Sequence, residues 1–143
     1  MTWVTRPSIH IDRAASAWLI SRFIDAQGAY VFVVDLEDAP KDAIPFDIVG
    51  VEFGHQGAHC TFETLLTRYT LDDPVLWRIG QIVHEADLDD GRFDAPEAAG
   101  FDVALRGLSM LGDDDLTLRV SGSMFDGLHQ FFHRELLLGR TPG

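Results

Sequence analysis

Hydrophobic positions recur at helical spacing through most of the chain, whereas strand-like runs are confined to its first 53 residues. Short β-branched and aromatic runs at residues 3–5, 29–34 and 46–53 predict three strands, the third bent near Gly50. Helical periodicity and capping residues predict helices at residues 11–25, 61–69, 74–87 and 96–111, a short one at 113–120, and a last one from Ser121 or Ser123 to 138.

This order of elements predicts an α+β fold, in which a small sheet of about three strands packs against five or six helices. The 143 residues are about the length of one ordinary domain, and no internal repeat divides them. Because 46% of the residues are hydrophobic, the chain can build one core. We therefore expect a single compact domain over residues 1–143.

The formal net charge is −12, from 23 acidic and 11 basic residues. Such a surface repels phosphate backbones, so we expect no nucleic-acid partner. No stretch approaches the roughly 18 consecutive apolar residues of a spanning helix, so we expect no membrane partner. Cys60 is the only cysteine, which suits a reducing compartment, and the N-terminus has no apolar run of signal-peptide length. These features predict a cytoplasmic protein.

The first predicted helix carries a charge within its apolar stripe. The stripe consists of Ala15, Trp18, Leu19 and Phe23. Arg22 falls inside it, and Asp12 lies near the same side at the start of the helix. A charged side chain in such a position must be paired or must line a cavity. Arg22 either extends past Trp18 to a structural carboxylate or serves as a pocket cation for an anionic or phenolic group.

A polar, Gly-rich loop between the third strand and the next helix holds four groups that could bind metal or move protons. These are Glu52, His55, His59 and Cys60. The start of a helix lowers the pKa of a nearby thiol, which would activate Cys60. The spacing does not match a tight zinc motif, and the alternative is a polar turn beside a buried, inert cysteine.

The helix at residues 74–87 offers His84 and Asp87, one turn apart. His84 points nearly opposite the Ile/Val stripe, so its face is either solvated or packed beneath the Glu52–His55 loop. In the second case the two segments supply two imidazoles and two carboxylates. This set suits a divalent ion such as Zn, Fe, Mn or Ni, without selecting among them.

The last helix carries aromatic side chains and a His129–His133 pair that more simply lies on the surface than chelates an ion. Phe125, Phe131 and Phe132 could make this helix the contact of a homodimer. A purely structural partner domain of this kind is one of three functions that the sequence leaves open.

At these positions the chain resembles the chromate-resistance family, in particular the C-terminal domain of its ChrB-type regulators. The most specific stretch is Asp12-Arg-Ala-Ala-Ser-Ala-Trp18-Leu-Ile-Ser-Arg22-Phe-Ile-Asp25. Further matches are Ile44-Pro-Phe-Asp47, Val51-Glu-Phe-Gly-His55, Cys60-Thr-Phe62, Leu71-Asp-Asp-Pro74, Ile82-Val-His-Glu-Ala-Asp87 and Asp89-Asp-Gly91. The resemblance covers about residues 3–135.

Two departures from the family pattern affect what the resemblance implies. Ser16-Ala17 stands where the family often has Cys-Pro before the tryptophan. The additional N-terminal domain of longer members has no counterpart here, which argues for a stand-alone version and against a transcriptional regulator. The resemblance further implies that the matching polar positions form one site: Asp12, Arg13, Trp18, Arg22, Glu52, His55, His84 and Asp87.

The function that we expect from this set is a small metal-dependent enzyme of lyase or hydrolase type, acting on a small oxygenated or anionic molecule. The metal ligands would be Glu52, His55, His84 and Asp87. The substrate-binding residues would be Arg13, Trp18, Arg22 and Phe53, and the catalytic residues Arg22, Asp12 and His59. The alternative is a non-catalytic domain that senses an oxyanion or another small ligand through Arg13 and Arg22.

Overall fold

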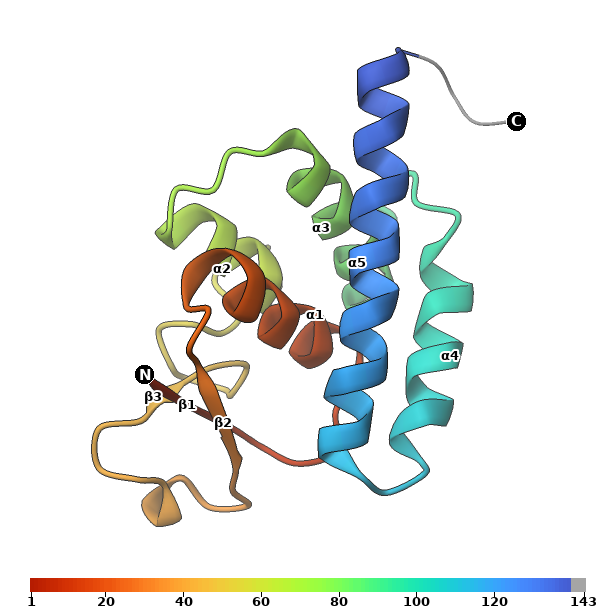
Figure 1. The fold of residues 1–143 in the computed structure, drawn as a ribbon. Coiled ribbons are helices and arrows are strands. Elements are labelled where there is room, and N and C mark those ends of the chain that lie inside the picture. Colours follow the sequence, from red (N-terminus) through yellow and green to blue (C-terminus); the bar gives the residue numbers. More distant parts are fainter. Residues whose placement is uncertain (140–143) are drawn as a thin grey trace.

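The computed structural model of the protein describes residues 1–139. In chain order its elements are β1 (Thr2–Thr5), α1 (Ile11–Leu19), β2 (Ala29–Phe32), β3 (Ile44–Pro45), α2 (Thr61–Arg68), α3 (Pro74–Leu88), α4 (Ala98–Ser109) and α5 (Asp114–Leu138). A π-helical turn, Ile20–Ile24, continues α1, and a 3₁₀ turn, Leu36–Asp38, follows β2. The predicted α+β class is confirmed: the small sheet lies at one end of the molecule and the helices fill the rest (Figure 1).

The sheet is parallel, with the strand order β2-β1-β3. Thr2 pairs with Ala29 and Thr5 with Phe32 across the first ladder, and Trp3 pairs with Ile44 across the second. Parallel neighbours need a crossover connection, which α1 provides between β1 and β2. The two core residues of the central strand, Trp3 and Val4, are buried.

The strand predicted at residues 46–53 is wrong. β3 ends at Pro45, and the segment after it makes only a single bridge, between Phe46 and Phe53. Asp47 and Gly50 adopt positive φ angles of 51° and 88°, which turn the chain out of extended conformation. Arg13 fixes this turn by donating hydrogen bonds to the side chain and the carbonyl of Asp47, at 3.0 and 2.9 Å.

The helices lie near their predicted positions, except that the last two are one continuous helix, α5. Asp113 caps it by accepting a hydrogen bond from the Leu116 amide at 3.0 Å. Ser121 and Ser123, which were expected to begin a separate helix, instead donate to backbone carbonyls of the preceding turn. A serine hydroxyl can bond in either way, so the pattern alone did not distinguish a cap from a helix interior.

α1 lies at the centre of the helical layer and contacts the other four α-helices. Its Trp18 ring stacks on Phe62 of α2 at 6.5 Å between centroids and packs against Phe125 of α5 at 5.5 Å. Large aromatic side chains contribute most of the apolar area in such a core. This packing fixes the end of α1 against α2 and α5.

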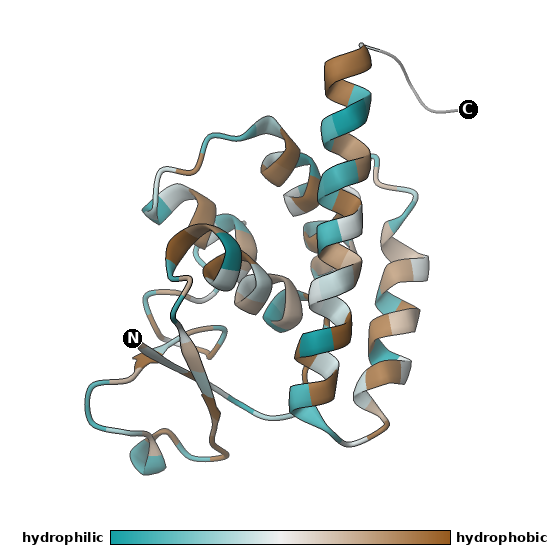
Figure 2. Ribbon diagram, viewed as in Figure 1, coloured by the Kyte–Doolittle hydropathy of each residue, from teal (hydrophilic) through white to brown (hydrophobic). Residues whose placement is uncertain are grey.

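The C-terminal turn of α5 extends past the core and is apolar (Figure 2). Leu136, Leu137 and Leu138 are largely exposed there. Of the aromatic residues expected on a dimer surface, Phe125 and Phe132 are buried in the core, and only Phe131 is exposed. Within residues 1–139, no helix combines the length and the apolar character of a membrane span.

Candidate functional site

Asp12 lies in the first turn of α1, but its buried carboxylate caps a different helix, α2. Its Oδ2 accepts a hydrogen bond from the Thr61 amide at 2.9 Å, and its Oδ1 accepts one from the Phe62 amide at 3.0 Å. The first amides of a helix have no partner inside it, and a negative charge there is favourable. Asp12 thereby joins α1 to the start of α2.

His55 reaches Asp12 from the Gly-rich loop and also meets α3. Its Nε2 lies 3.1 Å from Asp12 Oδ2 and 3.1 Å from Asp87 Oδ2. One ligand atom from each of the three residues lies within 4.8 Å of the others. We call Asp12, His55 and Asp87 the α1–α3 cluster; its members come from three separate segments of the chain.

The environment shifts the pKa of every member of this cluster. Burial raises the pKa of Asp12 to about 6, although its hydrogen bond with His55 opposes the rise. The hydrogen bond to Asp12 raises the pKa of His55 to about 9 and outweighs the effect of partial burial. Burial also raises the pKa of Asp87, while the charge of His55 lowers it. At neutral pH the imidazolium of His55 therefore lies between Asp12 and Asp87.

The α1–α3 cluster opens into a pocket of about 360 Å³. The residues that line it are Ser8, His10, Asp12, Arg13, Asp47, Ile48, Val49, Gly50, His55, Thr61 and Asp87. Thr61 donates its hydroxyl to Asp47 at 2.8 Å, and Arg13 donates to Asp47 and to the carbonyls of residues 6–8. Three carboxylates thus face two cations, so the lining carries a negative formal charge.

The structure separates the four predicted metal ligands. His55 and Asp87 are in contact, but Glu52 is exposed and lies 3.7 Å from Arg68. His84 belongs to a different cluster. Both side chains are exposed, but His55 reaches Asp12 and Asp87, whereas Glu52 lies beside Arg68.

The other predicted residues of this loop also lie away from the pocket. Phe53 packs against Trp3 and Tyr69, with centroid distances of 6.1 and 5.6 Å. His59 lines a separate pocket of about 270 Å³ together with Glu63 and Arg92. Neither side chain lines the pocket of the α1–α3 cluster.

The prediction that His84 points away from the core is wrong, because its side chain is fully buried. Its Nδ1 contacts the Glu63 carboxylate on α2, and its Nε2 lies 2.9 Å from Asp90 Oδ2. Burial alone would lower the pKa of His84, but the two carboxylate hydrogen bonds outweigh it and raise that pKa. A helical wheel gives the direction of a side chain but not what covers it, here α2 and the segment after α3.

Of the two alternatives for Cys60, the structure matches the buried cysteine and not the activated thiol. Cys60 precedes α2, yet it is buried, and burial raises the pKa of its thiol well above the usual value. Nearby carboxylates act in the same direction, and together they outweigh the favourable field of the helix start.

Trp18 and Arg22 also lie outside the α1–α3 cluster. Both bind Asp126 of α5: the Trp18 indole donates at 2.8 Å, and the Arg22 guanidinium donates at 3.0 and 2.9 Å. They line a pocket of about 400 Å³ on another part of the surface. Arg22 thus has the structural carboxylate partner that was one of its two expected alternatives.

Sequence reasoning missed several residues that complete these clusters. Asp47, Glu63 and Asp90 each bind a residue that was singled out, and His10 and Thr61 line the main pocket. Asp47 and Asp90 fell within segments that match the resembled family, which was the available signal. Acidic residues are common in the first turn of a helix, so nothing in the sequence pattern singled out Glu63.

The fold and the clusters together describe a small α+β domain with histidine–carboxylate contacts at the start of α2. The chain belongs to the family described as "ChrB, C-terminal domain", whose model matches residues 3–132. It is similar to Protein ChrB of Cupriavidus metallidurans, with 40% identity over 132 residues, which covers 91% of this chain and 40% of that protein. The chain thus spans about two fifths of that relative's length. No solved structure matches it.

Proposed function

We propose that the α1–α3 cluster binds a divalent metal ion and that the domain is a small metal-dependent enzyme. The observation that carries this proposal is the convergence of Asp12, His55 and Asp87, with ligand atoms within 4.8 Å of one another at the wall of a 360 Å³ pocket. One imidazole and two carboxylates suit Mn, Fe or Zn. Three protein ligands also leave coordination positions free for water or substrate.

The charge of the pocket favours a cation over a free oxyanion. Arg13 already donates to Asp47 and to three backbone carbonyls, and His55 lies between two carboxylates. Neither cation is left to bind an anion directly, and the net negative lining repels one. A bound divalent ion would displace the proton of His55 and cancel the negative charge of the lining, so an anionic substrate would enter only after the metal. These points support the enzyme over a metal-free oxyanion sensor.

A metal at this position would polarise a substrate oxygen or activate a water molecule, which is the chemistry of a lyase or hydrolase. The substrate class that fits the volume and lining is a small oxygenated molecule. His10 lines the same pocket and is the imidazole that we assign to proton transfer. Asp12 would present a fixed ligand to the ion, since its carboxylate is held by two backbone amides.

The test is manganese binding to the untagged, chelator-treated protein, measured by electron paramagnetic resonance and by elemental mass spectrometry after dialysis. We expect near one equivalent in the wild type and a large loss in His55→Gln and in Asp87→Asn. The matched controls are Glu52→Gln and His59→Gln, which change the same residue types outside the cluster. A wild type that takes up no Mn, Fe, Zn or Ni, or a loss that is equal in the controls, would refute the metal site.

A further inference from the structure

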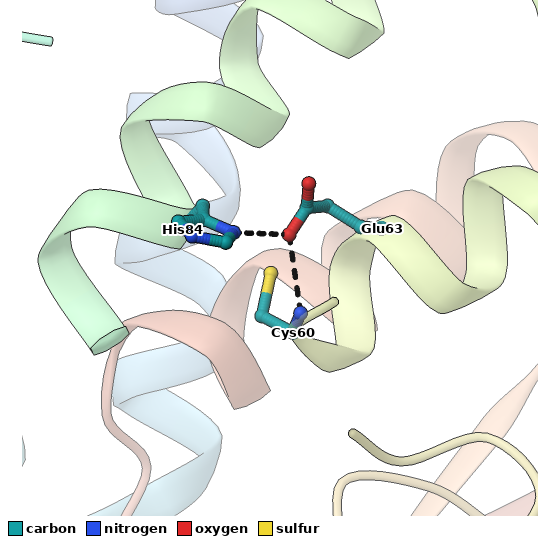
Figure 3. Close-up of side chains that lie close together, drawn as sticks. All are labelled: Cys60, Glu63 and His84. Atoms are coloured by element: carbon teal, nitrogen blue, oxygen red, sulfur yellow. Dashed lines mark hydrogen bonds and ion pairs between the residues drawn. The ribbon is translucent and has the colours of Figure 1, made fainter. Parts of the chain in front are cut away.

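A second group of ligand-type side chains lies at the start of α2, apart from the α1–α3 cluster. Figure 3 shows Cys60, Glu63 and His84 pointing toward one another, the first two from the start of α2 and the third from α3. One ligand atom of each lies within 4.8 Å of the others, and all three residues are buried. We call these three residues the α2–α3 cluster.

The backbone holds two of the three side chains in place. The Glu63 carboxylate accepts a hydrogen bond from the Cys60 amide at 3.1 Å, and the same oxygen contacts His84 Nδ1. Cys60 and Glu63 belong to the first turn of one helix, so their separation is set by helix geometry. His84 comes from the middle of the 15-residue helix α3, which packs on α2.

A carboxylate on the far side of the imidazole sets its orientation. His84 Nε2 lies 3.0 and 2.9 Å from the two oxygens of Asp90, so this nitrogen donates outward. Nδ1 then faces Glu63 and Cys60. A histidine that binds metal through one nitrogen commonly donates its other N–H to a carboxylate in this way, which fixes the tautomer.

We propose that Cys60, Glu63 and His84 form a second metal site, specific for a thiophilic divalent ion such as Zn²⁺ or Cd²⁺. The sulfur ligand distinguishes it from the oxygen-rich α1–α3 cluster, because soft thiolates select Zn and Cd over Mn or Mg. The proposal uses no residue of the α1–α3 cluster and does not depend on the proposed function.

When His84 starts protonated, the formal charge of Cys60, Glu63, His84 and the half-exposed Asp90 is unchanged by such binding. A thiol, an imidazolium and the two carboxylates of Glu63 and Asp90 sum to one negative charge. A divalent ion with a thiolate, a neutral imidazole and the same carboxylates also sums to one negative charge. The ion replaces two protons, so the buried region gains no net charge when the site is filled.

The ion has a short route to this site. Glu63 forms part of the wall of the 270 Å³ pocket, together with His59, Trp77, Gln81, Arg92 and Phe93. A water molecule from this pocket could complete four-coordinate geometry, which is usual for Zn²⁺ with three protein ligands.

The test is a Cd²⁺ titration of the reduced, metal-free full chain, followed by the sulfur-to-cadmium charge-transfer absorbance in the ultraviolet. We expect a band that saturates near one equivalent in the wild type and in Asp87→Asn, and that is absent in Cys60→Ser. Asp90→Asn should retain the band but weaken Cd²⁺ binding about tenfold to a hundredfold, as outer partners of metal-binding histidines do.

The wild-type result stands even if a variant fails to fold, because the band reports a Cd–S bond directly. Bound Cd²⁺ should also slow alkylation of Cys60 in the wild type. A titration without the band, or Cd²⁺ affinity that is unchanged in folded Cys60→Ser, would overturn the second site. Loss of Mn²⁺ binding with the cadmium band intact would refute only the proposed function, so the two failures are distinguishable.

Discussion

Burial and hydrogen bonding have opposite effects on the charge of Asp12. Burial favours its neutral form, while two backbone amides and His55 favour the carboxylate. The balance leaves its pKa at about 6, far above the value of an exposed aspartate. A buried group with such a shift, next to a pocket, is typical of a functional site.

The contact between His55 and Asp12 makes the free energy of unfolding depend on pH. The pKa of His55 is about 9 in the folded protein and ordinarily 6.5, so folding favours the charged form. This stabilisation is complete below about pH 6.5 and is lost as the pH rises through 9. Asp12, with a pKa of about 6, is already ionised over this window. We therefore expect the free energy of unfolding of the metal-free protein to fall between pH 6.5 and 9.

Urea denaturation at a series of pH values, with chelator present, measures this decrease. His55→Gln should flatten the profile, because it removes the titrating group while keeping a polar side chain. Some slope should remain, since the pKa of His84 is also raised and acts in the same direction. A profile of equal slope in His55→Gln would show that His55 is not charged between its two carboxylates.

The limit of sequence reasoning at this scale is the environment of a side chain. The direction of the His84 side chain on its helix could be predicted from the sequence. Its burial could not, because it depends on α2 and on the contact with Asp90. His55 and Asp87 were grouped through a family resemblance, and the structure brings them together. Asp12 was assigned to its own helix start, whereas its hydrogen bonds go to a helix 49 residues further along the chain.

At the scale of elements, the Asp126 carboxylate of α5 connects this helix to α1 through hydrogen bonds with two different side chains. Asp126 accepts from the Trp18 indole, which is almost fully buried, and from Arg22, which is about half exposed. An exposed ion pair contributes about 0–1 kcal/mol, whereas a buried donor left without a partner costs about 1–3 kcal/mol. The indole contact is therefore the more important of the two.

This difference gives a matched pair of variants. Arg22→Met removes the ion pair and should lower the free energy of unfolding by no more than about 1 kcal/mol. Asp126→Leu removes the ion pair and the indole acceptor, and should lower it by about 1–3 kcal/mol more. Urea denaturation of both variants measures the difference. Equal losses would mean that water satisfies the Trp18 indole when Asp126 is absent.

Elements with strong periodicity and clear caps were predictable, and those set by distant contacts were not. α3 begins with Asp73 and Pro74, a local signal that fixed its start from the sequence. The false strand at residues 46–53 had the right alternation, but Asp47 is held in a left-handed turn by Arg13, 34 residues earlier. No local pattern records such a contact.

At the scale of the whole molecule, the two clusters share α2 and α3 but differ in ligand type. His84 and Asp87 are one turn apart on α3, and each belongs to a different cluster. The sequence placed both in one site because their spacing allows it. The start of α2 separates them: Asp12 binds the amides of Thr61 and Phe62, and Glu63 binds that of Cys60.

The net charge of −12 surrounds both clusters with a field that attracts cations. That field is screened over about 10 Å at 0.1 M salt and about 3 Å at 1 M. We therefore expect added NaCl to weaken Mn²⁺ binding to the α1–α3 cluster progressively, although no ligand changes. Calorimetric titration over this salt range measures the effect.

A triple variant, Glu37→Gln with Asp38→Asn and Asp42→Asn, removes exposed acids that do not line the pocket and should reduce the salt dependence. A salt-independent affinity would mean that the local carboxylates alone determine how strongly the ion binds.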